Sequence, residues 1–358
     1  MTISRLLRRP RLLIVGCGDV GLRAARMLLA GAARPRVIAL TRRPEHAQAL
    51  RTAGVTPIPG DLDVAPSLRR LTGLAPAILH LAPPPSRGDE DSRTRALIAA
   101  LTAPRRLRAA AQPRARQLGP SRSLGVSGPS RWLPRDRRRA WLSGPPGALR
   151  QTGIVTDAAS GSRRPPRLVY ASTTGVYGDC GGAFIDETQP VRPLSARAKR
   201  RVSAERQCRR ATARGVLAAS IVRIPGIYAA DRLPRARIER GVPALVDEDD
   251  VYTNHVHADD LAAILLRARV RAGTSRVIHA SDDTVLKMGA YFDRVADVFG
   301  LARVPRITRE AAQRELEPVT LSFMSESRRL SNRRLKRELR TRLSFPSVDE
   351  FLETWRSG

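Results

Sequence analysis

The sequence predicts an α/β fold built around a parallel sheet. Apolar runs of strand length alternate with helical segments through the first third of the chain, a rhythm typical of βαβ units. The first apolar run, residues 11–15, ends in the pattern G-x-G-x-x-G and passes directly into a helical segment. With 358 residues, the chain is long enough to bury a full core.

The glycine pattern predicts a dinucleotide site at the end of the first strand. Gly16 permits a tight turn, Gly18 lets a pyrophosphate approach the backbone, and Gly21 lets the following helix pack close to its strand. The phosphates would lie at the N-terminus of that helix, residues 19–30. A glycine turn without a ligand is the alternative. It is disfavoured because strand, helix and second strand occur in the required order.

The remaining elements follow in sequence. We expect strands at 36–41, 55–58 and 77–82, with helices at 44–53 and 65–72 between them. The order resumes with a strand at 167–172, a helix at 195–213, a strand at 219–223, a helix from about 258 to 270 and a strand at 276–280. Helices are expected over 286–299 and 308–314 and, from a weaker pattern, over 325–339.

An arginine- and proline-rich segment at residues 103–166 interrupts this order. It holds 14 arginines, only two acidic residues (Asp136 and Asp157), and no sustained period of 2 or 3.6 residues. Because structureless stretches of this length are uncommon inside a domain, we expect a disordered insertion on a surface loop. Out-of-frame translation of GC-rich DNA and an arginine-rich RNA-binding arm are the alternatives.

Composition limits the classes of partner. The net charge is +31, but 61 of the 64 basic residues are arginine, which indicates a GC-rich coding sequence more than a selected nucleic-acid surface. Specific nucleic-acid binding is therefore not expected. Cys17, Cys180 and Cys208 have neither metal nor disulfide spacing. With no signal peptide and no apolar stretch near the roughly 20 residues of a membrane span, we expect a cytoplasmic protein.

Six motifs in order resemble the extended and atypical short-chain dehydrogenases/reductases, most nearly the bacterial NAD-dependent epimerase/dehydratase-like proteins. They are Gly16–Gly21, Gly60-Asp61-Leu62-Asp63, His80-Leu81-Ala82, Tyr170–Gly178, Arg223–Tyr228 and His257–Asp260. The resemblance covers most of the chain except 103–166. It implies a Rossmann-type, doubly wound parallel sheet with a small C-terminal substrate lobe, a nicotinamide dinucleotide and a small or nucleotide-linked polar substrate.

On this resemblance we divide the chain into three parts. Residues 1–102 and 167–228, to which 254–282 return, would form the dinucleotide-binding domain. Residues 229–253 and 283–358 would form the substrate lobe, and 103–166 the insertion. A homodimer is kept as an open alternative.

The end of the second predicted strand indicates which dinucleotide binds. An acidic residue there would hold the ribose 2′-hydroxyl of NAD, but the strand ends in Thr41-Arg42-Arg43. Two guanidiniums suit a 2′-phosphate, so we expect NADP, with NAD as the alternative. The resemblance also implies that Asp61 and Leu62 lie near the adenine. The expected cofactor-binding residues are Gly16, Gly18, Asp19, Val20, Gly21, Arg42, Arg43, Asp61, Leu62, Leu81 and Ala82.

The catalytic pair implied by the resemblance is missing. Members of the group use Tyr-x-x-x-Lys on a helix, and a Ser or Thr that ends the preceding strand binds the substrate oxygen. Thr173 matches that hydroxyl. Alignment of the helix places Arg197 at the tyrosine position and Arg201 at the lysine position; a shifted alignment keeps Lys199 but still lacks tyrosine. Arginine stays charged at any accessible pH, so Arg197 cannot be a general base.

Another proton donor is then required for catalysis. Tyr177, just beyond the strand, is the first candidate and Tyr228 the second, with packing beneath the substrate lobe as the alternative role of Tyr177. Arg197 and Arg201 share a helix face and, with Ser172, could contact an anionic substrate; a solvated basic face is the alternative.

Two functions therefore stay open. In the first, Thr173 orients the substrate and Tyr177 moves the proton during hydride transfer. In the second, the chain is a non-catalytic NADP-binding sensor, which the lost pair favours.

Two acidic motifs are expected to be structural. His257, Asp259 and Asp260 would cap a helix and join the two lobes, and no metal is expected there. Asp186 and Glu187 would form a loop-capping pair rather than catalytic carboxylates.

Overall fold

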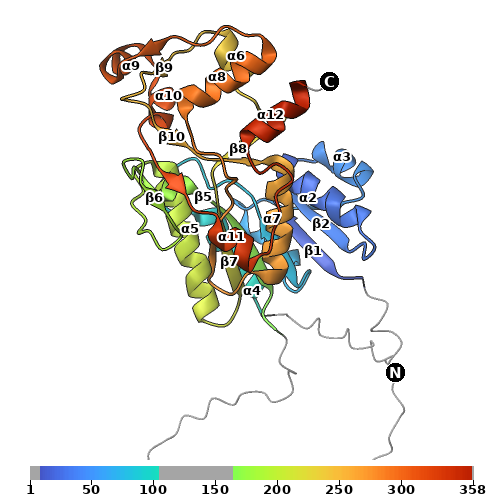
Figure 1. Cartoon of the computed structure of the whole chain (residues 1–358). Coiled ribbons are helices and arrows are strands. Elements are labelled where there is room, and N and C mark those ends of the chain that lie inside the picture. Colours follow the sequence, from blue (N-terminus) through green and yellow to red (C-terminus); the bar gives the residue numbers. More distant parts are fainter. Residues whose placement is uncertain (1–8, 105–163, 357–358) are drawn as a thin grey trace, which may run out of the picture. The chain divides into compact units, whose positions relative to one another are not determined.

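Seven parallel strands form the central sheet of the computed structural model, which describes residues 9–104 and 164–356 (Figure 1). Their spatial order is β3-β2-β1-β4-β5-β7-β12. The strands are β1 (Arg11–Val15), β2 (Arg36–Thr41), β3 (Thr56–Pro59), β4 (Ala77–His80), β5 (Arg167–Thr173), β7 (Ala218–Ile224) and β12 (Val277–His279). The order runs outward in both directions from β1 and β4. The predicted doubly wound, Rossmann-type sheet is confirmed.

Strand β1 shows why helices cover both faces of the sheet. Leu12 and Ile14 pack on one face with α2 (Asp19–Ala30) and α7 (Ala258–Arg271), which lie side by side (Figure 1). Leu13 and Val15 point to the opposite face, where the covering helices are η1 (Ala65–Leu71), α4 (Ser92–Thr102) and α5 (Ala196–Ala213). All four β1 side chains are at most 1 % exposed. A strand apolar on both faces is typical of a covered parallel sheet.

The other elements are short and lie mainly in the C-terminal part of the chain. They are α3 (His46–Thr52), η2 (Thr174–Tyr177), β6 (Phe184–Ile185), β8 (Gly226–Tyr228), α6 (Arg235–Glu239), β9 (Ala244–Leu245), β10 (Tyr252–Thr253), β11 (His255–His257), β13 (Leu286–Lys287), α8 (Met288–Phe299), β14 (Arg306–Ile307), α9 (Arg309–Glu315), α10 (Pro318–Phe323), β15 (Arg329–Leu330), α11 (Arg333–Glu338) and α12 (Val348–Arg356).

A separate apolar cluster joins α6, α8 and α12. Its members include Ile238, Phe292, Val295 and Leu352, each at most 5 % exposed. The cluster lies in the residues assigned to a substrate lobe. The division of the chain into domains itself stays a prediction.

The expected helix over 325–339 is wrong. Residues 329–330 form β15, which pairs with β6, and only 333–338 are helical. Between them the Asn332 amide donates to the carbonyl oxygens of Ser281 and Asp282 and to the Asp283 carboxylate. These long-range contacts hold Asn332 outside the helix, so tertiary structure overrides a weak local pattern.

Helices α4 and α12 were not predicted. The Asp91 carboxylate caps α4 by accepting from the Thr94 amide at 2.9 Å. Ser347 caps the start of α12: its hydroxyl accepts from the Glu350 amide at 3.2 Å and donates to the Glu350 carboxylate at 3.3 Å. The Ser-x-x-Glu spacing was a usable sequence signal for α12.

The predicted insertion at 103–166 lies outside the described residues except at its two ends, so its order and the RNA-binding alternative are not described by the structure. Its boundaries coincide with the end of α4 at Thr102 and the start of β5 at Arg167. Within the described ranges, no helix has the length and apolarity needed to cross a membrane.

Candidate functional site

The turn between β1 and α2 requires glycine at Gly16. Its φ is +87°, and a Cβ added there would lie 2.4 Å from the backbone nitrogen of Ala82. A Cβ on Gly21 would lie 3.3 Å from Ile14, so the helix packs closely on its strand. A Cβ on Gly18, by contrast, would meet nothing within 4 Å. The backbone is therefore tightly packed on the protein side and open at Gly18, as a pyrophosphate cradle requires.

The N-terminus of α2 leaves hydrogen-bond donors available. Gly18 is the N-cap residue and supplies no side-chain cap. Across residues 9–104 and 164–356, no acceptor contacts the backbone N–H groups of Asp19, Val20 and Gly21. The Asp19 carboxylate instead pairs with Arg23 at 2.9 Å and Arg232 at 3.1 Å. Free amides at a helix N-terminus suit an anion.

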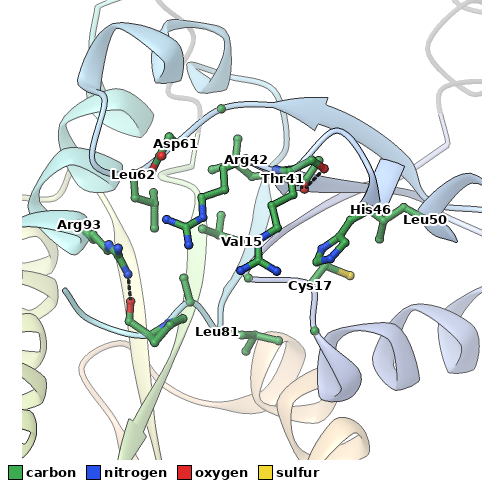
Figure 2. A pocket seen from close by; sticks show the side chains of 17 residues that line it. Val15, Cys17, Thr41, Arg42, His46, Leu50, Asp61, Leu62, Leu81 and Arg93 are labelled. Carbon is green, nitrogen blue, oxygen red and sulfur yellow. Dashed lines mark hydrogen bonds between the residues drawn. The ribbon is translucent and has the colours of Figure 1, made fainter. Parts of the chain in front are cut away.

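A cavity of about 410 Å³ opens beside this turn, at the carboxyl ends of β1, β2 and β4 (Figure 2). In Figure 2 the Arg42 side chain extends from the end of β2 into the space bordered by Leu62 and Arg93. The volume suits a nucleoside. The cavity is lined by Val15, Gly16, Cys17, Gly18, Leu40, Thr41, Arg42, Arg43, His46, Leu50, Gly60, Asp61, Leu62, Leu81, Ala82, Pro83 and Arg93.

The charged side chains in this cavity differ in whether an ion-pair partner neutralises them. Arg93 binds the Asp63 carboxylate through two hydrogen bonds of 2.8 and 2.6 Å, which lower the pKa of Asp63. Within the described part of the chain, neither Arg42 nor Arg43 forms an ion pair, and both are exposed. Their guanidiniums therefore remain available to an anion at the end of β2.

A second cavity, of about 180 Å³, brings together residues predicted from four distant segments. It is lined by Val20, Leu81, Ala171, Ser172, Thr173, Arg197, Arg201, Ile224, Pro225, Ile227, Leu261 and Leu265. Val20 and Leu81 were predicted to bind the cofactor, and Thr173 was predicted to be catalytic. Arg197 and Arg201 were predicted to contact the substrate. Leu81 lines both cavities.

The two adjacent hydroxyls at the end of β5 differ in availability. Ser172 is 3 % exposed and its hydroxyl donates to the Glu205 carboxylate at 2.6 Å. The Thr173 oxygen accepts from the Gly175 amide at 3.4 Å, which leaves its proton free to donate. Thr173, rather than Ser172, can therefore donate a hydrogen bond to a substrate oxygen.

Arg197 and Arg201 stand one helical turn apart on α5. Arg201 is buried, and its Nη1 donates to the Ala171 carbonyl oxygen at 2.7 Å and to the Tyr170 hydroxyl at 3.1 Å. Arg197 is exposed. Desolvation lowers the pKa of Arg197, and the charges of Arg201 and Arg200 lower it further. The tyrosine and lysine positions of the implied pair are thus occupied by two cations.

Tyr177 lies outside both cavities. It is 1 % exposed, its oxygen accepts from Arg223 at 2.7 Å, and burial raises its pKa to about 12. His279 Nδ1 lies 3.0 Å from the Ser331 carbonyl oxygen and must donate to it, so Nε2 accepts the Tyr177 proton at 2.5 Å. The proton-donor role of Tyr177 stays a prediction that this geometry does not favour.

Tyr228 is buried as well. Its hydroxyl donates to the Ser347 carbonyl oxygen at 3.3 Å, and burial raises its pKa.

A series of buried, hydrogen-bonded polar side chains begins at Ser172 in the wall of the second cavity. Arg223 binds Glu205 at 2.7 Å with both side chains 4 % exposed, and Glu205 in turn accepts from Ser172. The chain continues through Tyr177 to His279. We call these five side chains the buried relay. Sequence reasoning missed its pairing, as it missed His46 and Arg93 in the first cavity, because no local pattern marks such contacts.

The two acidic motifs have structural roles. His257 is the N-cap of α7 and accepts from the Asp259 amide at 3.3 Å, while Asp260 accepts from the amides of Ser344 and Phe345. The predicted capping role is confirmed, whereas the joining of two lobes stays a prediction. Asp186 accepts from the Thr188 amide within its loop, whereas Glu187 accepts from the His279 amide on β12. No cluster that could hold a metal occurs in the described residues.

Solved structures share this fold. A functionally unknown conserved protein from Silicibacter pomeroyi DSS is 25 % identical, with a TM-score of 0.67 and coverage of 97 % of this chain and 98 % of the other. DesIV, a dTDP-glucose 4,6-dehydratase from Streptomyces venezuelae solved with NAD, is 20 % identical, with a TM-score of 0.64 and coverage of 97 % and 96 %. A UDP-glucuronic acid 4-epimerase from Bacillus cereus, also with NAD, is 12 % identical, with a TM-score of 0.60 and coverage of 96 % and 99 %.

Sequence comparison gives the family. Among curated protein sequences, none matches this chain significantly. A family model, however, matches residues 12–281, which include every residue that lines the two cavities. The match spans most of the chain and contains the glycine turn, Thr173 and the second-cavity residues Arg197 and Arg201. The chain therefore belongs to the NAD dependent epimerase/dehydratase family.

Proposed function

We propose that this chain binds a nicotinamide dinucleotide, with NADP preferred over NAD. The observation that carries the proposal is that the two cavities meet the glycine turn from either side: Gly18 lines the first, Val20 lines the second, and Leu81 lines both. Structural neighbours solved with NAD support binding of the dinucleotide class. The preference for NADP rests on Arg42 and Arg43, which stand where an acidic residue would favour NAD.

The residues present fit the parts of such a ligand. The amides of Asp19, Val20 and Gly21 would hold the pyrophosphate, while Asp61 and Leu62 would border the adenine. The backbone of Ala82, against which Gly16 packs, completes the turn. When bound, the dinucleotide would supply a hydride donor or acceptor in its nicotinamide ring.

We infer that the reaction, where one occurs, is hydride transfer on a small or nucleotide-linked polar substrate. Thr173 would donate a hydrogen bond to the substrate oxygen, because its proton is free. Arg197 and Arg201 would orient an anionic part of the substrate without exchanging protons. Tyr177 remains the proposed proton donor only if the buried relay opens.

A non-catalytic dinucleotide sensor is the second candidate. It is favoured by the absence of a tyrosine or lysine from the residues that line the second cavity. Measurement of dinucleotide turnover with a panel of sugars, aldehydes and quinones separates the two. Tight binding with no oxidation of any substrate, even at high protein concentration, would support the sensor.

The substitution Gly18→Asp tests dinucleotide binding directly. A Cβ added at Gly18 meets no protein atom within 4 Å, so the variant should fold and melt like the parent. Its carboxylate would stand where the pyrophosphate approaches, so calorimetry should detect no binding of NADP or NAD. Gly273→Asp is the matched control: Gly273 is exposed beyond α7, and its added Cβ approaches only the Arg276 side chain, at 4.0 Å. Unchanged affinity in folded Gly18→Asp, or no heat with either dinucleotide for the parent protein, would refute the proposal.

A further inference from the structure

The second cavity contains positive charge that the protein does not neutralise. Arg197 and Arg201 both line it, and no ion pair to either residue is found in residues 9–104 and 164–356. Arg223 gives a useful contrast in the same part of the fold. Its guanidinium is 4 % exposed and is paired with the Glu205 carboxylate at 2.7 Å. Burial alone therefore does not explain why the buried Arg201 lacks a carboxylate, and the exposed Arg197 beside it lacks one as well.

Arg201 is held in place but not saturated. It is 7 % exposed, and only Nη1 donates to protein acceptors, the Ala171 carbonyl oxygen and the Tyr170 hydroxyl. Its Nε is buried without an acceptor among the described residues. A buried donor without a partner is costly, and a buried charge without a counter-charge is more so. The side chain is thus fixed by its Nη1 contacts and leaves donors for a ligand in the cavity.

Arg197 lies one turn earlier and completes a cationic pair. Arg197 has no hydrogen bond within the described ranges, and the charges of Arg201 and Arg200 lower its pKa in addition to desolvation. An anion placed between Arg197 and Arg201 would relieve this repulsion. Carboxylates and phosphates accept the parallel hydrogen bonds that guanidiniums offer.

The rest of the cavity limits the body of the ligand. Apart from the two arginines, the side chains are the Ser172 and Thr173 hydroxyls, Pro225 and aliphatic groups: Val20, Leu81, Ala171, Ile224, Ile227, Leu261 and Leu265. Ser172 already donates to Glu205, so Thr173 is the hydroxyl available to the ligand. The volume of about 180 Å³ excludes a large polar group.

We propose that the second cavity is an oxyanion subsite, which holds the carboxylate or phosphate group of a small substrate between Arg197 and Arg201, next to Thr173. The oxygen on the reacting carbon would accept from Thr173. The reaction at this site rests on the proposed dinucleotide function, but the binding of the anion does not. The substrate class becomes a small organic acid or a small phosphate ester rather than a neutral sugar or alcohol.

Calorimetric titration of the full chain with inorganic phosphate and, separately, with pyruvate tests this subsite without any dinucleotide. Ionic strength is kept constant with chloride, because a protein of net charge +31 attracts anions non-specifically. We expect saturable binding of at least one probe. Loss of one charged pair in Arg197→Gln should weaken it about tenfold or more. The stronger probe distinguishes a phosphate from a carboxylate substrate.

Arg206→Gln is the matched control for Arg197→Gln. Arg206 is exposed on the same helix, does not line the cavity, and its replacement removes the same charge. The proposal is overturned if neither probe saturates, or if both variants weaken binding equally. A thermal melt of each variant verifies folding, which the exposed positions should preserve.

Titration of the same samples with NADP and NAD separates the two proposals. Anion binding that depends on Arg197, without any dinucleotide binding, would refute the proposed function and leave the subsite intact. Dinucleotide binding without Arg197-dependent anion binding would refute the subsite and leave the proposed function intact.

Discussion

Reversal of charge at Arg42 should change which dinucleotide the chain prefers. Arg42 follows directly after β2, points into the first cavity and has no ion-pair partner among the described residues (Figure 2). Arg42→Asp removes one guanidinium from a 2′-phosphate and places a carboxylate in its position. The same change leaves the 2′-hydroxyl of NAD with an acceptor, which is the arrangement that favours NAD.

The expected magnitude follows from exposure. A hydrogen bond between charged groups contributes about 1.5–3 kcal/mol, but Arg42 is exposed, so solvent and salt reduce the effect toward the lower limit. Repulsion from the new carboxylate adds a similar amount. We therefore expect NADP binding to weaken about 10- to 100-fold, whereas NAD binding changes by less than about threefold.

Isothermal titration with both dinucleotides at about 0.15 M salt measures this difference. Arg36→Asp is the control, because Arg36 is exposed at the opposite end of the same strand. Six residue steps at about 3.3 Å place it roughly 20 Å from Arg42, beyond the Debye length of about 8 Å. Equal loss of NADP and NAD affinity in Arg42→Asp would refute the assignment of Arg42 to the phosphate. So would an Arg36→Asp variant that discriminates as strongly.

Three further outcomes are expected. Gly16→Ala should lower the free energy of unfolding by at least about 2 kcal/mol in urea titrations, because its φ of +87° and its 2.4 Å approach to Ala82 both oppose a Cβ; a smaller loss would mean that the turn is less restrained than described. Tyr177→Phe should cost about 1–3 kcal/mol by leaving Arg223 Nη1 and His279 Nε2 without a partner, yet dinucleotide affinity should not change; a fall in turnover larger than the loss of folded protein would restore Tyr177 as a proton donor. Stability should decrease as pH falls from about 6.5 toward 4, because burial lowers the pKa of His80 and His279 to about 3 and of His255 to about 4, so the unfolded chain binds more protons. Burial raises the pKa of Asp282 to about 7, so this group binds its proton in the folded state and stabilises the fold as pH falls. The free energy of unfolding should therefore change by a net amount of the order of 1–3 kcal/mol per pH unit. Urea midpoints that stay constant over this range would contradict these protonation states.

The elements that follow from local sequence patterns could be predicted from the sequence. The strands of the sheet are buried on both faces, so their apolar runs mark them, and glycine spacing marks the β1–α2 turn. Because parallel strands end at the same edge, the residues that follow β1, β2, β4 and β5 converge there. Thr173, at the end of β5, was therefore placed at this edge in advance, whereas Arg197 and Arg201 were assigned through the family resemblance, and the roles of all three stay predictions.

Contacts between distant segments were not accessible. Ser172 and Glu205 are 33 positions apart, and Tyr177 and His279 are 102 apart. Tyr177 follows the strand in sequence, which made it the first candidate for the proton donor, but its side chain is buried against His279. The polarity of a residue gives no sign of which distant partner will bury it. The same reason explains the helix expected over 325–339, where Asn332 binds residues 281–283 instead.

The buried relay has a consequence for how this interior can be altered. Its five side chains come from β5, η2, α5, β7 and β12, and each is buried and hydrogen-bonded to another member. Loss of Glu205 alone would leave the Arg223 charge buried and unpaired, whereas joint replacement of both by apolar residues of matched volume removes both charges and leaves only the neutral Ser172 and Tyr177 hydroxyls without these partners. The fold should therefore tolerate replacement of Glu205 and Arg223 together better than replacement of either residue alone. A double-mutant cycle on this pair should show strong positive coupling.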